Sequence, residues 1–127
     1  MNGPTKDLIK YRIARAKETF EDAKLLAEKH RWNSAINRLY YAAFYAIIAL
    51  LLKENHKSTT HNGVKTKFSD HFIKTGLFPT ELARIYSQLF TWGLQCSAAP
   101  AFSASPKNHR NMLHKVSSPK NSLLFLF

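Results

Sequence analysis

A long apolar helix is predicted by the segment Trp32-Asn-Ser-Ala-Ile-Asn-Arg-Leu-Tyr-Tyr-Ala-Ala-Phe-Tyr-Ala-Ile-Ile-Ala-Leu-Leu-Leu52. Its apolar residues recur at steps of three and four, the period of one helix face. A second apolar face lies beside the first, and the two faces together hold Ile36, Leu39, Tyr40, Ala43, Ile47, Leu50 and Leu51, then Tyr41, Phe44, Tyr45, Ile48 and Leu52. Because such a helix must be covered on nearly all sides, we expect it at the centre of an α-helical bundle or between a bundle and a partner chain.

Three further helices are expected around this one. The four predicted ranges are 6–30 with Thr5 as N-cap, 34–55, 64–75 ending before Gly76, and a helix that starts at Pro79 or Thr80. The last should continue past Phe90, to about residue 99, although Gly93 and Pro100 weaken it. The sequence therefore predicts an all-α fold, an antiparallel four-helix, up-and-down bundle. Residues 1–90 form its core domain.

The composition limits the class of protein. A chain of 127 residues with 45% hydrophobic residues is long enough for one domain with a real core. Its one cysteine, Cys96, cannot form an internal disulfide, which favours a reduced, cytoplasmic protein. No signal peptide is apparent at the N-terminus, and the uncharged segment 39–52 is shorter than the roughly 20 residues that span a bilayer, so no membrane association is expected.

A formal net charge of +11 is large for this length. It favours polyanionic partners, with RNA or DNA first and acidic proteins second. A soluble basic protein without such a partner is the plain alternative.

The chain changes character after Phe90. All eight acidic residues precede position 82, whereas the segment 91–127 has four basic residues and three of the five prolines. We expect a tail that is mostly irregular or disordered, ending in the apolar Leu123-Leu-Phe-Leu-Phe127.

No metal or cofactor is expected. His56 and His61 share one polar segment and His71 falls in the third helix, but no cluster of Cys, Asp or Glu completes a ligand set. Glycines are scattered, so no phosphate-binding loop exists, and Cys96 has no predictable activating neighbour.

One polar stripe on the central helix is a candidate binding site. Asn37, Arg38, Tyr41 and Tyr45 lie one or two helical turns apart. An arginine beside tyrosines can hold a phosphate and stack on a base. The more common arrangement is that such tyrosines are core or dimer aromatics with their hydroxyls at the rim.

The segment Thr60-His61-Asn62-Gly63 precedes the third helix. His61 could reach an active centre, or the segment could only cap the helix, which is the commoner case.

These residues together resemble the HEPN superfamily (higher eukaryotes and prokaryotes nucleotide-binding domain), and in particular its small stand-alone prokaryotic members. The resemblance covers about residues 8–90. It rests on Arg15-Ala-Lys-Glu-Thr-Phe-Glu-Asp-Ala-Lys-Leu-Leu26, Trp32 to Tyr45 with its Arg-x-Tyr-Tyr-Ala-x-Phe core, His61-Asn-Gly-Val64, Phe68, His71 to Gly76, and Leu89-Phe90.

The resemblance implies a helical bundle that forms homodimers around a polar cleft. Many members are metal-independent ribonucleases, often toxins of toxin–antitoxin pairs that are held in check by a minimal nucleotidyltransferase. Their catalysis uses an Arg and a His on a late helix. In the subgroup that this chain resembles, that helix usually reads Leu-Phe-x-x-Arg-x-x-x-Asp-Tyr or similar.

The late motif is missing from this chain. Gly93 occupies the position expected for the catalytic Arg, and no Asp-Tyr follows. We therefore expect residues 91–127 to come from a shifted reading frame or a decayed copy; the rival explanation is a divergent member with an unusual last helix.

Two classes of function follow. The first is an RNA-binding HEPN protein or ribonuclease-type toxin component, catalytically impaired here, with Asn37, Arg38, Tyr41, Tyr45 and His61 as the RNA- or nucleotide-binding residues. The second is a non-catalytic dimeric module for protein interaction, or for nucleotide binding.

Overall fold

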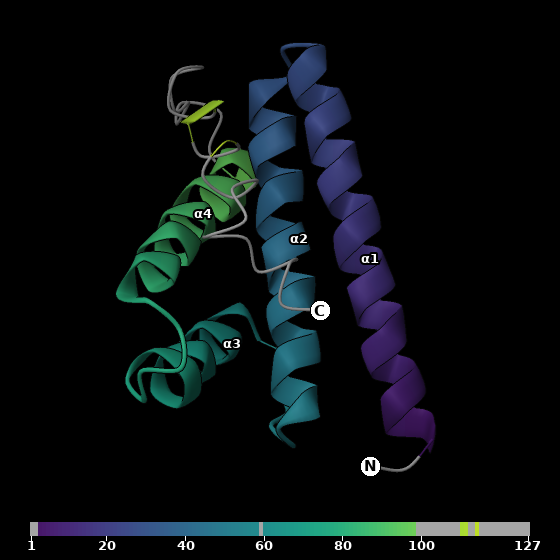
Figure 1. Cartoon of the computed structure of the whole chain (residues 1–127). Helices are drawn as coiled ribbons and strands as arrows, with labels where there is room; N and C mark the ends of the chain where they lie inside the picture. Colours follow the sequence, from purple (N-terminus) through teal and green to yellow (C-terminus); the bar gives the residue numbers. More distant parts are fainter. Residues whose placement is uncertain (1–2, 59, 99–109, 112–113, 115–127) are drawn as a thin grey trace.

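The computed structural model describes residues 3–58, 60–98, 110–111 and 114, and all its regular elements are helical. They are α1 (Gly3–Glu28), α2 (Trp32–Lys53), α3 (His61–Phe68), the π-helix η1 (Ser69–Ile73) and α4 (Thr80–Ala98). Helices α1 and α2 run antiparallel along their whole length, while α3 and α4 lie on the other side of α2 (Figure 1). The predicted all-α bundle is confirmed.

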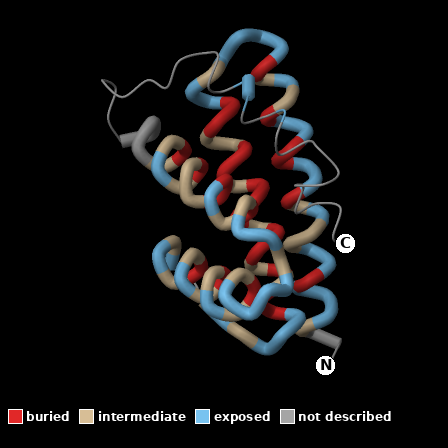
Figure 2. Tube along the Cα trace, turned by 60° about the vertical axis from the view of Figure 1, so that its left-hand side comes forward, coloured by how far each residue is buried: buried red, intermediate tan, exposed pale blue. Residues whose placement is uncertain are grey.

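Helix α2 is the centre of the bundle. Twelve of its residues are buried, including Ile36, Leu39, Tyr40 and Ile47, and the buried positions follow its length in Figure 2. The helix is long and apolar enough to cross a membrane, but 72% of its most apolar window is buried inside the protein. That burial is typical of a core helix covered by its neighbours.

Helix α1 packs its small residues on α2. Ala16, Ala23 and Ala27 are buried together with Phe20. The predicted start was wrong, because the helix begins at Gly3 and Thr5 therefore lies within it rather than at its N-cap. The helix ends at Glu28, two residues before His30, whose positive φ of 57° turns the chain toward α2.

Helix α3 begins at His61, before the predicted start at Val64, so His61, Asn62 and Gly63 form its first turn rather than a segment that precedes it. The Thr60 hydroxyl accepts a hydrogen bond from the backbone N–H of Gly63 at 2.9 Å, which satisfies one of the free donors of the first turn. After Phe68 the helix widens into η1, which holds His71 and buries Phe72. Gly76, at φ 79°, ends the segment as expected.

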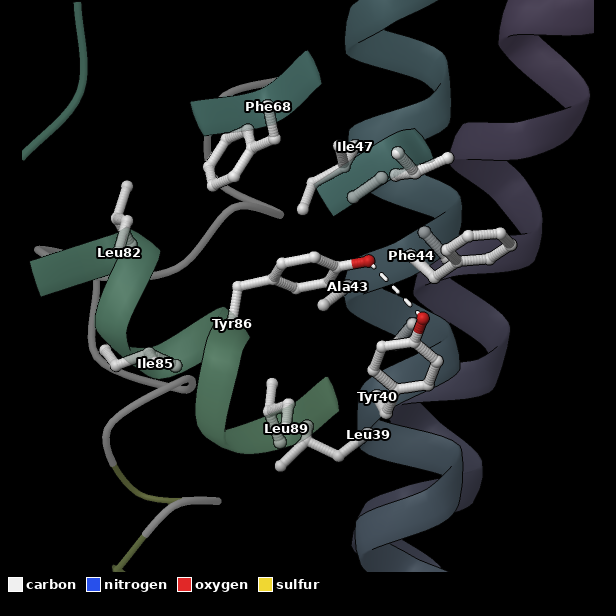
Figure 3. Close-up of a cluster of buried hydrophobic side chains, with 14 of the residues drawn as sticks. Leu39, Tyr40, Ala43, Phe44, Ile47, Phe68, Leu82, Ile85, Tyr86 and Leu89 are labelled. Atoms are coloured by element: carbon white, nitrogen blue, oxygen red, sulfur yellow. Dashed lines mark hydrogen bonds between the residues drawn. The ribbon is translucent and has the colours of Figure 1, made fainter. Parts of the chain in front are cut away.

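Helix α4 continues through Gly93 to Ala98 and packs against α2. Its inner face is Leu82, Ile85, Tyr86 and Leu89, all of them buried (Figure 3). Most of the tail predicted to be irregular lies outside the described residues; positions 110, 111 and 114 have helical backbone.

Candidate functional site

The side chain of Tyr40 links the core to the polar start of α3. Its ring is fully buried and stacks on the rings of Phe44 and Tyr86, with centroids 5.9 and 5.7 Å away. Its hydroxyl lies 2.8 Å from Nδ1 of His61 and 3.5 Å from the hydroxyl of Tyr86, and Figure 3 shows the pair of tyrosines. A chain of hydrogen bonds therefore runs from the core to His61.

The contact with Tyr40 occupies one nitrogen of the His61 ring. Nδ1 lies 2.8 Å from the Tyr40 hydroxyl, and which of the two groups donates depends on the tautomer of the imidazole. Nε2 has no partner among the described residues and is not enclosed, so it is the ring nitrogen that a ligand can contact.

Burial keeps both tyrosines protonated. Desolvation raises the pKa of Tyr40 from 10.0 to about 12, because a buried phenolate is unfavourable. Desolvation also raises the pKa of Tyr86, and more strongly. Both hydroxyls therefore remain hydrogen-bond donors at neutral pH.

Arg38 is held by neutral groups. Its Nε and Nη2 atoms donate to Oδ1 of Asn37 at 3.3 and 2.8 Å, and its guanidinium carbon lies 4.9 Å from the centre of the Tyr41 ring. Among the described residues, no carboxylate forms an ion pair with it. A half-buried positive charge without a counter-charge attracts anions.

His61 and Arg38 meet at the Tyr41 ring. The imidazole packs edge-to-face on that ring with centroids 5.8 Å apart. Tyr41 in turn contacts Tyr45, and the Arg15 guanidinium carbon of α1 lies 5.6 Å from the Tyr45 ring centre. Two arginines and one imidazole therefore border a half-buried tyrosine pair.

Gly93 brings α4 against this site. A Cβ built on Gly93 would lie 2.5 Å from Cβ of Tyr40, which is closer than two carbon atoms can approach. The Gly93 carbonyl accepts a hydrogen bond from Nδ2 of Asn37 at 3.0 Å, and this bond orients the amide so that its oxygen faces Arg38. In this arrangement an arginine side chain has no space at position 93, where the resemblance places the catalytic Arg.

The structure brings together most of the predicted site residues. Asn37, Arg38, Tyr41 and His61 form one contiguous cluster, and Tyr45 lies one turn further along α2. Thr60 caps α3 as one interpretation predicted, and His61 contacts the Tyr41 ring of the cluster; its place in an active centre stays a prediction. Arg15 of α1 contacts the cluster through Tyr45.

Sequence reasoning missed the role of Tyr40, Tyr86 and Lys65. Tyr40 looked like an ordinary core residue, and only the fold places its hydroxyl beside His61. Lys65 lies one turn after His61, and its ammonium group is 4.6 Å from the Phe90 ring centre. The spacing of His61 and Lys65 was the one signal that both side chains share a face of α3.

No metal centre is found in the described part of the chain, where no three His, Cys, Asp or Glu side chains gather. His56 and His71 do approach each other, as a stacked pair with ring centroids 3.8 Å apart. This pair lies where α2 ends and η1 passes, away from the Arg38 cluster.

The comparisons with known proteins agree on one family. The HEPN domain profile matches residues 9–115. A Thermotoga maritima protein named "UPF0332 protein" is 43% identical over 83 residues, which are 65% of this chain and 63% of that protein. The Methanocaldococcus jannaschii protein named "Putative toxin MJ0142" is 26% identical over 81% of this chain and 70% of that protein. A second protein of the same organism, "Putative toxin MJ0605", is 32% identical over 72% of this chain and 65% of that protein.

The HEPN match extends past the end of α4 and covers far more than half of the 127 residues. The helical bundle is the fold that the sequence resemblance implied. This chain belongs to the HEPN domain family.

Proposed function

We propose that this protein is a toxin-like HEPN protein that binds RNA through the cluster Asn37, Arg38, Tyr41, Tyr45 and His61. The observation that carries the proposal is the guanidinium of Arg38, which is held by an amide and an aromatic ring without a carboxylate partner among the described residues. The net charge of +11 and relatives named as toxins support it.

Each group in the cluster suits a part of single-stranded RNA. Arg38 and the imidazole of His61 can bind a phosphate, and the rings of Tyr41 and Tyr45 can stack with bases. Arg15 and Lys65 add positive charge at the two ends of the cluster. Binding should therefore weaken steeply as salt concentration rises.

The same geometry argues against efficient cleavage. A general base needs a free lone pair, and the hydrogen bond with Tyr40 already engages Nδ1 of His61. Gly93 supplies no charge to stabilise a transition state. We therefore propose a protein that binds RNA and is impaired as a ribonuclease.

A homodimer is part of the proposal. Tyr41 and Tyr45 of α2 are only half-buried, and the Tyr11 side chain of α1 is 56% exposed. Such an apolar strip is typical of an interface between chains. The proposed further partner is a nucleotidyltransferase antitoxin in the cytoplasm. The second candidate function is a non-catalytic interaction module, which the same apolar strip favours.

The test is RNA binding by fluorescence anisotropy with a labelled 12-nucleotide single strand. Arg38→Ala should weaken binding about tenfold, the effect expected for losing a charge-assisted contact. The matched control is Arg84→Ala, which removes the same charge from an exposed position of α4 paired with Glu81. Equal affinities of the two variants would contradict the assigned site, and no RNA binding by the wild-type protein would favour the interaction module.

A further inference from the structure

A cavity of about 210 Å³ lies between the N-terminal part of α1 and the C-terminal end of α2. Its apolar wall is formed by Leu8, Ile48, Leu51 and Leu52. Since a dry cavity of roughly 150 Å³ accommodates benzene, this one has room for a small organic molecule. It does not include any residue of the Arg38 cluster.

The polar side of the cavity is basic. It is formed by Arg12, His56, Lys57 and Ser58, and none of the described lining residues is acidic. The ring of His56 is held in place by stacking on His71. A cavity with one apolar wall and one cationic wall suits an amphiphilic anion.

Arg12 gives the most specific indication of a ligand. Its Nε atom is enclosed and has no hydrogen-bond partner among the described residues. A buried donor without an acceptor is costly, and native proteins rarely leave one so. The side chain of Arg12 also lines the pocket, and a guanidinium can hold a carboxylate with two parallel hydrogen bonds.

We propose that this cavity is a binding site for a small monocarboxylate with a short apolar body. The carboxylate is held by Arg12, with Lys57 and Ser58 beside it, and the apolar body lies on Leu8, Ile48 and Leu52. The site stands apart from the proposed RNA site, so it would exist whether or not the protein binds RNA.

The experiment is a titration of the full-length protein with sodium hexanoate at constant ionic strength, followed by NMR. We expect saturable shifts of the Leu8, Ile48 and Leu52 methyl signals and of the Arg12 Nε signal, with nuclear Overhauser contacts from the hexanoate chain to those methyl groups. 1-Hexanol, which lacks the charge, and acetate, which lacks the chain, should each bind at least tenfold more weakly. Equal binding of hexanol would overturn the proposal, because the cavity would then be a merely apolar one.

Arg12→Gln should weaken hexanoate binding about tenfold or more, and Lys17→Gln should leave it unchanged. Lys17 is the matched control because it lies on α1, is exposed and removes the same charge. Equal losses in the two variants, or shifts in the wild-type protein that never saturate, would overturn the proposal. The Overhauser contacts in the wild-type protein decide the matter even where a variant folds poorly.

Discussion

The hydroxyl of Tyr40 lies 2.8 Å from Nδ1 of His61, so a core residue of α2 holds the ring of an imidazole on α3 in its orientation. Tyr40 is fully buried, whereas His61 is half-buried. Packing of the core and chemistry at the surface are therefore coupled through a single hydrogen bond. A change inside the bundle should be visible at the site.

Tyr40→Phe should lower the free energy of unfolding by about 1–3 kcal/mol, because Tyr86 then keeps a buried hydroxyl without its acceptor. It should also let the His61 proton move to either ring nitrogen, which ¹⁵N NMR of the imidazole reports directly. Urea denaturation gives the stability. Tyr41→Phe is the control, since it removes a hydroxyl from a half-buried ring on the same helix; similar losses in both variants would contradict the special role of Tyr40.

Stability should fall in alkaline solution. The pKa of Tyr40 is raised from 10.0 to about 12 in the folded protein, so between these pH values the unfolded chain loses the proton that the folded chain retains. Loss of that proton favours unfolding, and stability should decrease as the pH rises from 10 through 12. Urea denaturation at pH 9, 10 and 11, with tyrosine ionisation followed at 295 nm, checks this; an unchanged stability over that range would disagree with it.

Gly93→Ala should destabilise the protein although alanine is the better helix former. The new methyl group would meet Cβ of Tyr40 at 2.5 Å, and overpacking of this kind costs about 1–3 kcal/mol, more than the gain of up to about 1 kcal/mol in helix propensity. Thermal unfolding by circular dichroism is the measurement. Thr91→Ala, at an exposed position of the same helix, should have little effect, and a stabilised Gly93→Ala would show that α4 does not approach α2 so closely.

Asn37→Asp should lower the affinity for RNA although the Arg38 side chain itself is unchanged. The new carboxylate would pair with the guanidinium that now bonds to the amide oxygen, and it would neutralise the charge offered to phosphate. The affinity should fall about tenfold and the salt dependence should become shallower. Asn33→Asp, an exposed change of equal charge near the start of α2, is the control.

The fold could be predicted from the sequence because its signals are local and repeated. The apolar period of α2, the Thr60 cap and the αL residue Gly76 each fix an element by short-range rules. The start of α1 was placed three residues too late, since a helix end with several compatible residues is the weakest of these signals. The π-helix after Phe68 has no sequence signature that these rules detect.

The candidate site could be predicted in part. The stripe of Asn37, Arg38 and Tyr41 follows from helical spacing alone. The meeting of His61 with Tyr40 does not, because it depends on how α3 packs across α2. From the sequence, Gly93 was identified only as the residue at the position expected for the catalytic arginine. Its close contact with Tyr40 depends on the distance between two helices, which the spacing of residues within one helix does not predict.

The packing at Gly93 has an evolutionary consequence. A side chain at this position requires α4 to withdraw from α2, which would break the hydrogen bond from Asn37 and uncover the Tyr40 ring. A single substitution of Gly93 by arginine would therefore give a misfit. Changes in α2 that make room beside Tyr40 would have to come first, so the order in which mutations accumulate decides which side chains the fold accepts at position 93.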